Sequence, residues 1–295
     1  MSFINIHVAS QAHLSVKNNQ LVLTKEGEQI DYPLEDVSSV MIENLQTSIS
    51  TYTLSKLAQN NVVTYICDEK HMPCACALPF NSHYATQKVY RLQTSVSAPL
   101  KKQLWKDIVH HKILNQNQCL KLCGKGGGLE DLLGKIKSGD NTNIEAVAAN
   151  KYFKILFGKN FTREQENNTN SALNYGYAII RGAVARSIVS HGLLAVLGLK
   201  HSNTFNNYNL ADDIMEVFRP FVDLCVYQNM DLKFDKNFKV ELYRLLTANC
   251  DVHGSKYTLA YAVEIFVQSL VDSFEKGENK LKFPNLIAIE GHVFK

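Results

Sequence analysis

The segment from His201 to Asp223 carries the residues best suited to chemistry. It holds one imidazole and four carboxylates, those of Asp212, Asp213, Glu216 and Asp223. Imidazole and carboxylate groups are ligands that proteins offer to ions such as Mg²⁺ and Mn²⁺. The cluster is therefore a candidate for a divalent metal site.

Residues 209–230 are expected to form the helix that presents this cluster, with Asn209 as its N-cap. Four charged side chains, spaced by 4, 3 and 4 positions, share one face of such a helix: Asp212, Glu216, Arg219 and Asp223. A charged face of this kind can also be a solvent-exposed surface joined by ion pairs. Pro220 removes a backbone N–H and predicts a bend, which favours a shaped site.

One His and one Glu leave a hard cation short of ligands, so a further group is needed. Glu145 is the strongest candidate, because it lies near an expected helix start and is followed one turn later by Ala148 and Ala149. These small side chains would let another element approach the carboxylate. Two alternatives stay open: Glu145 as an ordinary first-turn glutamate favoured by the helix dipole, and His201 as a histidine at a helix end.

Other motifs in the sequence are weaker. Residues 124–128 are rich in glycine, but the order Gly-x4-Gly-Lys-Ser/Thr of a phosphate-binding loop is missing, and a flexible helix stop explains them. The pairs Cys74/Cys76 and Cys119/Cys123 lack the spacing of a structural zinc site. No His-Glu-x-x-His or Gly-x-Ser-x-Gly pattern occurs. Zinc-protease and serine-hydrolase chemistry are therefore disfavoured.

The composition is that of a folded globular protein. The chain has 295 residues, of which 45% are hydrophobic, enough for one large or two ordinary domains. A formal net charge of +3, from 31 basic and 28 acidic residues, does not by itself indicate a nucleic-acid partner. Seven cysteines without a signal peptide predict a cytoplasmic location. The longest apolar run, 192–199, is too short for the roughly 20 residues of a membrane span.

The pattern of apolar residues changes near residue 80. Before this point, one expected helix at 50–60 is surrounded by β-rich runs at 13–17, 20–25, 37–43 and 62–67. Beyond it, helices are expected at 97–123, 143–157, 171–191, 209–230, 239–249 and 258–276. The sequence therefore predicts an α+β protein. Its domains are a small N-terminal β-sandwich-like domain with one helix, residues 1–80, and a larger all-α C-terminal catalytic domain, residues 81–295.

Several motifs occur in an order that carries a family resemblance. Glu145 lies in an alanine-rich helix before Tyr152-Phe153, and Leu-Asn-Tyr-Gly-Tyr-Ala at 173–178 is followed by Arg181. His201-Ser-Asn and Leu-Ala-Asp-Asp-Ile-Met-Glu-Val-Phe-Arg-Pro, ending at Pro220, come next. Together these motifs resemble the CRISPR-associated integrase of spacer acquisition, the catalytic subunit of the adaptation complex, and most of all its type II branch. The resemblance spans essentially the whole chain.

The resemblance implies a catalytic and metal-binding triad, with Mg²⁺ or Mn²⁺ as cofactor, at Glu145, His201 and Glu216. Val217 stands where the family often has proline, but this departure lies beside the ligand and leaves the triad intact. Asp212 and Asp213 match the family's acidic pair and are expected to orient ligands or hold metal-bound water. Arg219 is expected to pair with them or with a phosphate.

By the same resemblance, the protein inserts fragments of foreign DNA into a CRISPR array, by attack of their 3′-hydroxyls on leader–repeat phosphodiesters, in antiviral defence. The implied partners are DNA and a second copy of the chain, bound through the N-terminal domain. Further implied partners are the small second adaptation protein in a heterohexameric complex, the RNA-guided effector nuclease and a ring-shaped DNA-end-binding protein. Two other functions stay open: a metal-dependent nuclease that hydrolyses branched DNA, and a catalytically idle DNA-binding scaffold.

Basic residues are candidates for gripping the DNA. Arg181 and Arg186 interrupt the largely apolar run 178–199, where an unpaired charge would be costly, so each is expected to face a phosphate or an acidic partner. The remaining candidates can also be read as ordinary surface charge: Arg163, Lys200, Arg244, Lys101, Lys102, Lys106 and Lys112.

Overall fold

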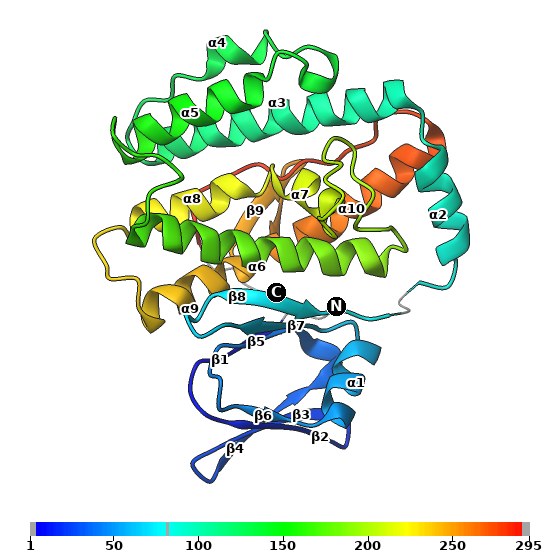
Figure 1. Ribbon diagram of the computed structural model, residues 1–295, viewed down its shortest axis with the longest axis vertical. Coiled ribbons are helices and arrows are strands. Elements are labelled where there is room, and N and C mark those ends of the chain that lie inside the picture. Colours follow the sequence, from blue (N-terminus) through cyan, green and yellow to red (C-terminus); the bar gives the residue numbers. More distant parts are fainter. Residues whose placement is uncertain (1–3, 81–82, 291–295) are drawn as a thin grey trace.

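The computed structural model describes residues 4–80 and 83–290. Two parts follow one another along the longest axis of the molecule, with sheets at one end and helices at the other (Figure 1). The strand-rich part is N-terminal and the helical part is C-terminal, so the predicted α+β class is confirmed. No helix within the described residues is long and apolar enough to span a bilayer.

Two four-stranded sheets form the N-terminal part. In the first, of order β1-β5-β7-β8, the strands β1, β5 and β7 are parallel and β8 is antiparallel to β7. Its strands are β1 (Ile4–Val8), β5 (Val37–Ile42), β7 (Val63–Cys67) and β8 (Pro73–Ala77). The strands of the second sheet, in spatial order, are β4 (Glu28–Pro33), β3 (Gln20–Lys25), β2 (His13–Lys17) and β6 (Ser48–Ile49).

Aliphatic side chains and one helix fill the space between the two sheets. Helix α1 (Thr51–Gln59) begins after Ser50, whose hydroxyl accepts a hydrogen bond from the Thr53 N–H. Leu57 of this helix shares a buried core with residues of both sheets, among them Leu14, Leu21, Val37 and Val40. The prediction of a β-sandwich-like part with one helix is thus confirmed, with β1, β4, β6 and β8 in addition to the predicted strands.

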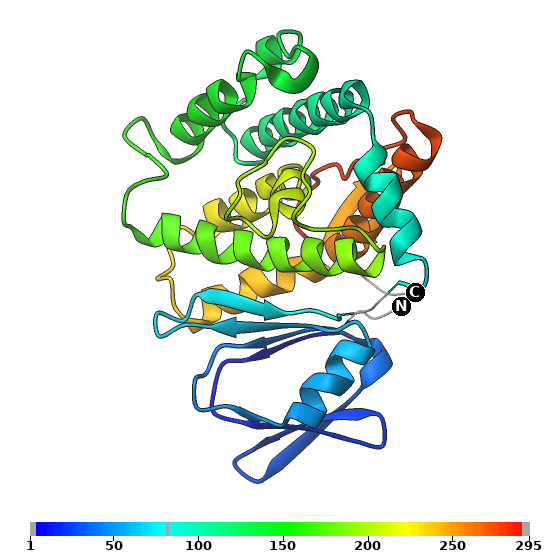
Figure 2. The ribbon, with the colours of Figure 1, turned by 45° about the vertical axis from the view of Figure 1, so that its right-hand side comes forward.

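Helices make up most of the C-terminal part. They are α2 (Thr86–Ser95), α3 (Ala98–Leu122), α4 (Glu130–Leu133), α5 (Ile144–Phe157), α6 (Asn168–Ser190), α7 (Asn209–Met215), α8 (Arg219–Gln228), α9 (Lys236–Arg244) and α10 (Leu259–Lys276). Short 3₁₀ turns occur at η1 (Leu34–Asp36), η2 (Ser138–Asp140) and η3 (Leu245–Thr247). In both ribbon views, α3 and α5 lie far from the sheets, with α7 and α8 between them and α6 (Figures 1 and 2).

Helix α6 joins the helical part to the first sheet. It runs across β7 and β8 (Figure 2), and the Tyr65 hydroxyl of β7 donates a hydrogen bond of 2.8 Å to the Ile179 carbonyl of α6. A Cβ atom at Gly182 would overlap the Tyr65 ring. Glycine at this position therefore lets the helix approach the sheet.

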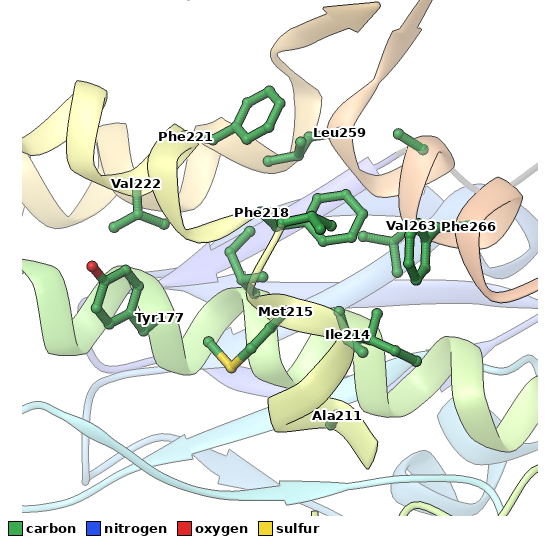
Figure 3. Packing of buried hydrophobic residues seen from close by; sticks show 14 of the residues in the cluster. Tyr177, Ala211, Ile214, Met215, Phe218, Phe221, Val222, Leu259, Val263 and Phe266 are labelled. Carbon is green, nitrogen blue, oxygen red and sulfur yellow. The ribbon is translucent and has the colours of Figure 1, made fainter. Parts of the chain in front are cut away.

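A second, larger core surrounds the junction of α7 and α8. The rings of Phe218 and Phe266 meet edge to face with centroids 6.0 Å apart. Figure 3 shows Ile214 and Met215 of α7 on the same core as Leu259 and Val263 of α10. Dense packing on this side fixes the position of the α7–α8 junction, on which the candidate site depends.

The predicted helix 209–230 is divided into α7 and α8. The division agrees with the bend expected at Pro220, which lies in the first turn of α8. Asn209, expected as the N-cap, is instead the first residue of α7 and is buried, and its side-chain amide donates to the carbonyls of Val196, Asn203 and Asn206. It holds the preceding loop in place, and does not cap the helix.

The all-α description of residues 81–295 needs one correction. Residues expected at the end of helix 239–249 leave the helix at Arg244, and β9 (Asn249–Val252) pairs with β10 (Ser255–Thr258) as an antiparallel hairpin. Its turn residues His253 and Gly254 have positive φ angles of 52° and 81°. This left-handed pair is the geometry of a tight hairpin turn, and glycine is well suited to it.

Glu43, which follows β5, anchors α9 to the first sheet. Its buried carboxylate lies 2.5 Å from Nε2 of His7 and 2.9 Å from Nζ of Lys239 on α9. Burial alone would raise the pKa of Glu43, but hydrogen bonds from His7 and Lys239 outweigh it and lower the pKa. Lys239 also lies over the rings of Tyr175 and Phe234. The two parts of the protein therefore share a buried ion pair.

Replacing Lys239 with methionine should lower the free energy of unfolding by about 3 kcal/mol, because it leaves the buried Glu43 carboxylate without its cation. Chemical denaturation of both proteins measures this difference. Lys256→Met is the control, since Lys256 pairs with Glu290 on the surface and should cost less than about 1 kcal/mol. Equal losses in the two variants would contradict the anchoring role of Glu43.

Candidate metal site

Glu145 lies in the first turn of α5, where Asp140 fixes its backbone. The two oxygens of Asp140 accept hydrogen bonds from the N–H groups of Ile144 (2.9 Å) and Glu145 (3.0 Å). Gly139, Asp140 and Asn143 have positive φ angles of 69°, 47° and 54°, so the chain turns sharply before the helix. The sequence prediction missed Asp140, although an Asp shortly before a helix start is a known capping signal.

His201 is oriented by Asp213, which is completely buried in α7. The Asp213 carboxylate accepts hydrogen bonds from the backbone N–H groups of Leu199 (2.6 Å), Lys200 (3.0 Å) and His201 (3.2 Å), and lies 2.7 Å from Nδ1 of His201. Because a carboxylate accepts, Nδ1 carries the proton and Nε2 keeps the lone pair that a metal would need. Asp213 thus orients a predicted ligand, as the sequence led us to expect.

The hydrogen bond to Asp213 raises the pKa of His201, and the negative charge of Glu216 raises it further. Trp105 of α3 packs edge to face against His201, with ring centroids 5.8 Å apart. A side chain at Gly198 would collide with the Asp213 carboxylate, so the loop depends on glycine there. Trp105 and Asp213 thus both hold the His201 ring in place.

Glu216 lies in the break between α7 and α8. The chain turns tightly here, with hydrogen bonds from the Phe218 N–H to the Met215 carbonyl (2.9 Å) and from the Phe221 N–H to the Phe218 carbonyl (3.1 Å). Pro220 has no N–H to donate to the turn before it. Asn115 of α3 compensates by donating to the Val217 carbonyl at 2.9 Å. A proline and a buried amide therefore hold the Glu216 backbone out of a regular helix.

The Glu216 side chain is buried and surrounded by positive charge. Its Oε1 lies 3.1 Å from Nε of Arg219 and its Oε2 lies 2.5 Å from Nζ of Lys112. Burial alone would raise the pKa of Glu216, but the charges of Arg219 and Lys112 lower it overall. Arg219, expected beside Asp212 and Asp213 or on a phosphate, therefore pairs with Glu216.

Lys112 joins Glu145 to Glu216. Its ammonium nitrogen lies 2.5 Å from Glu145 Oε1 and 2.5 Å from Glu216 Oε2, so the two oxygens cannot be further apart than twice that distance. We call Glu145 and Glu216 the carboxylate pair. Burial would lower the pKa of Lys112, but the charges of Glu216 and Glu145 raise it. The ammonium is therefore charged between the two acids.

The donor groups of the expected triad fit Mg²⁺ or Mn²⁺, since they are two carboxylates and one imidazole nitrogen. The carboxylate pair converges on a single point, the ammonium of Lys112, which lies 2.5 Å from an oxygen of each acid. Within the described residues, however, no three His, Cys, Asp or Glu side chains are close enough to hold a metal as they stand. Lys112 occupies the point at which the carboxylate pair meets.

Asp212 is not turned toward the carboxylate pair. It forms a two-point ion pair with Arg181 of α6, with distances of 2.9 and 3.0 Å, and Arg181 lies over the Tyr208 ring. Arg181 also donates to Asn206 at 2.9 Å. The acidic partner expected for Arg181 is therefore present within the protein.

The other predicted DNA-binding residues are scattered. Arg186 binds Glu264 and the Asn61 carbonyl, and so also has an acidic partner inside the protein. Arg163 donates to Asn170 and Asn174. Arg244 pairs with Glu241 on α9, across α6 from α3 and α5 (Figures 1 and 2).

Lys200 and Lys102 lie nearer to the carboxylate pair. Lys200 Nζ donates to the Gly139 carbonyl at 3.3 Å, and the Lys102 side chain packs against Gly139. Lys102 belongs to α3 and Lys200 to the loop before His201, and both are exposed and contact the loop that precedes Glu145. Of the predicted basic residues, these two are placed beside the candidate metal site and face solvent.

Asp223 contradicts the alternative of a solvent-exposed acidic face. It is buried and accepts hydrogen bonds from the hydroxyls of Tyr152 (3.0 Å) and Tyr177. Burial raises the pKa of Asp223 to about 6. Asp212, Glu216 and Asp223 thus have three separate sets of partners, and Asp223 supports the packing of α5, α6 and α8.

Asp223 should make folding stability depend on pH. Its pKa is higher in the folded protein than in the unfolded chain, so the folded state binds the proton more tightly, and this stabilisation is lost as the pH rises from about 4 to about 7. Relative to Asp223→Asn, which does not titrate, the wild type should lose about 3 kcal/mol of unfolding free energy over this range. Denaturation at both pH values measures the change, and a constant difference would refute it.

Asp213→Asn should lower the pKa of His201, because it removes the carboxylate that stabilises the protonated imidazole. Titration of the His201 ring resonances by NMR measures this pKa in both proteins. Asp212→Asn is the matched control, because the Asp212 carboxylate pairs with Arg181 and should have a smaller effect. An unchanged pKa in Asp213→Asn would show that Asp213 does not control the imidazole.

Known proteins resemble this chain over most of its length. The family model of CRISPR associated protein Cas1 matches residues 6–241. A CRISPR-associated endonuclease Cas1 of Neisseria meningitidis serogroup C (strain 8013) is 36% identical over 304 aligned positions, covering 100% of both chains.

Solved structures share the fold. A casposase bound to integration product superposes with a TM-score of 0.77 at 18% identity, over 95% of this chain and 92% of that one. A chain of a Cas6-RT-Cas1–Cas2 complex superposes with a TM-score of 0.74 at 17% identity, over 96% of this chain and 36% of that one. The family match and the full-length relative confirm the resemblance carried by the motifs: the chain belongs to the CRISPR-associated Cas1 family.

Proposed function

We propose that this protein is a divalent-metal-dependent DNA integrase and endonuclease, which inserts fragments of foreign DNA into a CRISPR array in antiviral defence. The observation that carries the proposal is that the carboxylates of Glu145 and Glu216 meet at the buried ammonium of Lys112. Asp213 orients the imidazole of the third expected ligand, His201, through its Nδ1. Membership of the Cas1 family and a full-length relative named as an endonuclease support it.

Glu145, Glu216 and Nε2 of His201 would hold Mg²⁺ or Mn²⁺. When bound, such an ion supplies positive charge that polarises phosphate oxygens and favours ionisation of a nearby hydroxyl. Asp213 keeps the proton on Nδ1 of His201, so that Nε2 is free to bind. The hydrogen bonds that Asp140 accepts from the N–H groups of Ile144 and Glu145 fix the backbone of Glu145. The contacts of Asp213 and Asp140 would therefore reduce how far the side chains must move when a metal binds.

The reaction exchanges one phosphodiester for another. The 3′-hydroxyl of the incoming DNA attacks a phosphorus of the leader–repeat DNA, a new P–O bond forms, and the original 3′-oxygen leaves and takes up a proton. Because no net phosphodiester bond is lost, the step needs neither ATP nor a covalent protein intermediate. Lys102 and Lys200 are exposed beside the carboxylate pair and are positioned to contact DNA phosphates.

The partners follow the same proposal. We expect DNA to bind a homodimer joined through the N-terminal domain, residues 1–80, with the small second adaptation protein in a heterohexameric complex. A structural neighbour that contains Cas1 and Cas2 supports this partner, and a casposase bound to integration product supports joining of DNA strands. The RNA-guided effector nuclease, the ring-shaped DNA-end-binding protein, the type II branch and the cytoplasmic location remain predictions.

Glu145→Gln, His201→Ala and Glu216→Gln should each lower strand joining by at least about a hundredfold, because each removes a metal ligand. The measurement is joining of a labelled duplex with 3′-hydroxyl ends to a plasmid that carries a CRISPR leader and repeat, with Mn²⁺ or EDTA and with the second adaptation protein. In EDTA, the three variants should keep much of the DNA affinity of the wild type, since most phosphate contacts lie elsewhere.

Glu241→Gln is the matched control, because Glu241 pairs with exposed Arg244 on α9 and should leave joining unchanged. Metal-dependent cutting without joining would favour the branched-DNA nuclease. Binding without any reaction in the wild type would favour the idle scaffold.

A further inference from the structure

Lys112 is the charged group of the site that the proposed reaction does not use. It lies in the middle of α3, and its side chain is buried at 6% exposure although it ends in a charge. A buried lysine costs free energy unless its charge is compensated. Two contacts of 2.5 Å to the carboxylate pair supply that compensation. The space between the two carboxylates therefore favours a positive charge.

Lys112 and a divalent metal would compete for the same space. Mg²⁺ binds carboxylate oxygens at about 2.0–2.1 Å, only slightly closer than the ammonium of Lys112 lies to Glu145 and Glu216. An ion that bridged the carboxylate pair would overlap the ammonium and repel it. The Lys112 side chain is long and has several rotatable bonds, so its nitrogen can withdraw while α3 stays in place.

The charges around the site cancel while Lys112 remains between the acids. Glu145 and Glu216 carry two negative charges, and Lys112 and Arg219 carry two positive charges. A divalent ion would add two positive charges, and a DNA phosphate entering the site would offset part of this excess.

We propose that Lys112 is a resident cation of the metal site: it holds the carboxylate pair together until a divalent ion displaces it, and then turns its ammonium to the DNA phosphate. The proposal rests on the metal-dependent function proposed above. It makes metal binding weak without DNA and stronger with DNA. By thermodynamic linkage, the metal then strengthens DNA binding by the same factor. Lys112 is on this account a positioning residue that couples the two ligands.

Binding of Mn²⁺, followed by electron paramagnetic resonance of the free ion, tests the proposal directly. Lys112→Met removes the competing charge and keeps much of the side-chain volume. Without DNA, the variant should bind Mn²⁺ about tenfold or more tightly than the wild type. A short duplex with 3′-hydroxyl ends should raise the Mn²⁺ affinity of the wild type far more than that of the variant. Equal Mn²⁺ affinities of the two proteins without DNA would overturn the proposal.

Two further variants separate charge from structure. Lys112→Arg keeps a cation at the site and should retain weak Mn²⁺ binding without DNA. Lys239→Met removes the other buried lysine, which pairs with Glu43 away from the site, and should leave Mn²⁺ affinity unchanged. Tighter Mn²⁺ binding in either variant would overturn the proposal, since it would then not depend on the charge of Lys112.

The wild-type protein provides a test that does not depend on the folding of a variant. Reductive methylation followed by peptide mass spectrometry reports how accessible each lysine amine is. Lys112 should be protected in EDTA, become more reactive in Mg²⁺, and be protected again when DNA is added with Mg²⁺. Lys239 should be protected throughout. Unchanged protection of Lys112 in Mg²⁺ would overturn the proposal even if strand joining is normal, whereas loss of joining in the wild type would refute only the proposed function.

Discussion

Glu145 of α5 and Glu216 in the break between α7 and α8 point into one small, largely buried space, and the mutual repulsion of their carboxylates is the constraint on which the rest of the site depends. An uncompensated charge in such a place would cost about 3–5 kcal/mol. Lys112 of α3 and Arg219 of α8 supply the balancing charge. Helix α3 therefore contributes directly to the site, because it places the Lys112 ammonium between Glu145 of α5 and Glu216 in the α7–α8 break.

The backbone around the candidate metal site leaves regular helix at Glu216 and His201, and hydrogen bonds from neighbouring elements hold it in place. The break at Glu216 exposes a carbonyl, and Asn115 of α3 satisfies it. The loop that carries His201 is tied to the buried Asp213 by several N–H groups. Asp223 joins three helices through two tyrosine hydroxyls. Polar groups that a surface helix would expose to water are used here to fix the positions of neighbouring elements.

The sequence predicts most of the long helices, because the periodicity of a helix is a local pattern of apolar residues. Helices α1 and α3 begin one residue after Ser50 and Ser97, at which the predicted helices start, and Pro220 marks the bend. Contacts between residues that are far apart in the sequence leave no such local pattern. Nothing local shows that Lys112, predicted as one of several DNA-binding lysines, lies between Glu145 and Glu216, since Lys112 is 33 positions from Glu145 in the sequence and further still from Glu216. Strand β4 was missed because most of its residues are exposed and its apolar alternation is limited to Ile30 and Tyr32.

One hypothesis joins the metal ligands to Lys112: Glu145, His201 and Glu216 bind the metal, and the metal displaces the Lys112 ammonium. Crystals of the protein with Mn²⁺ and a short DNA duplex, measured by anomalous scattering at the manganese edge, test it most directly. We predict an anomalous peak bounded by Glu145, Glu216 and Nε2 of His201, with the Lys112 ammonium displaced toward a phosphate. A manganese ion bound elsewhere, with Lys112 still between the carboxylates, would contradict the account.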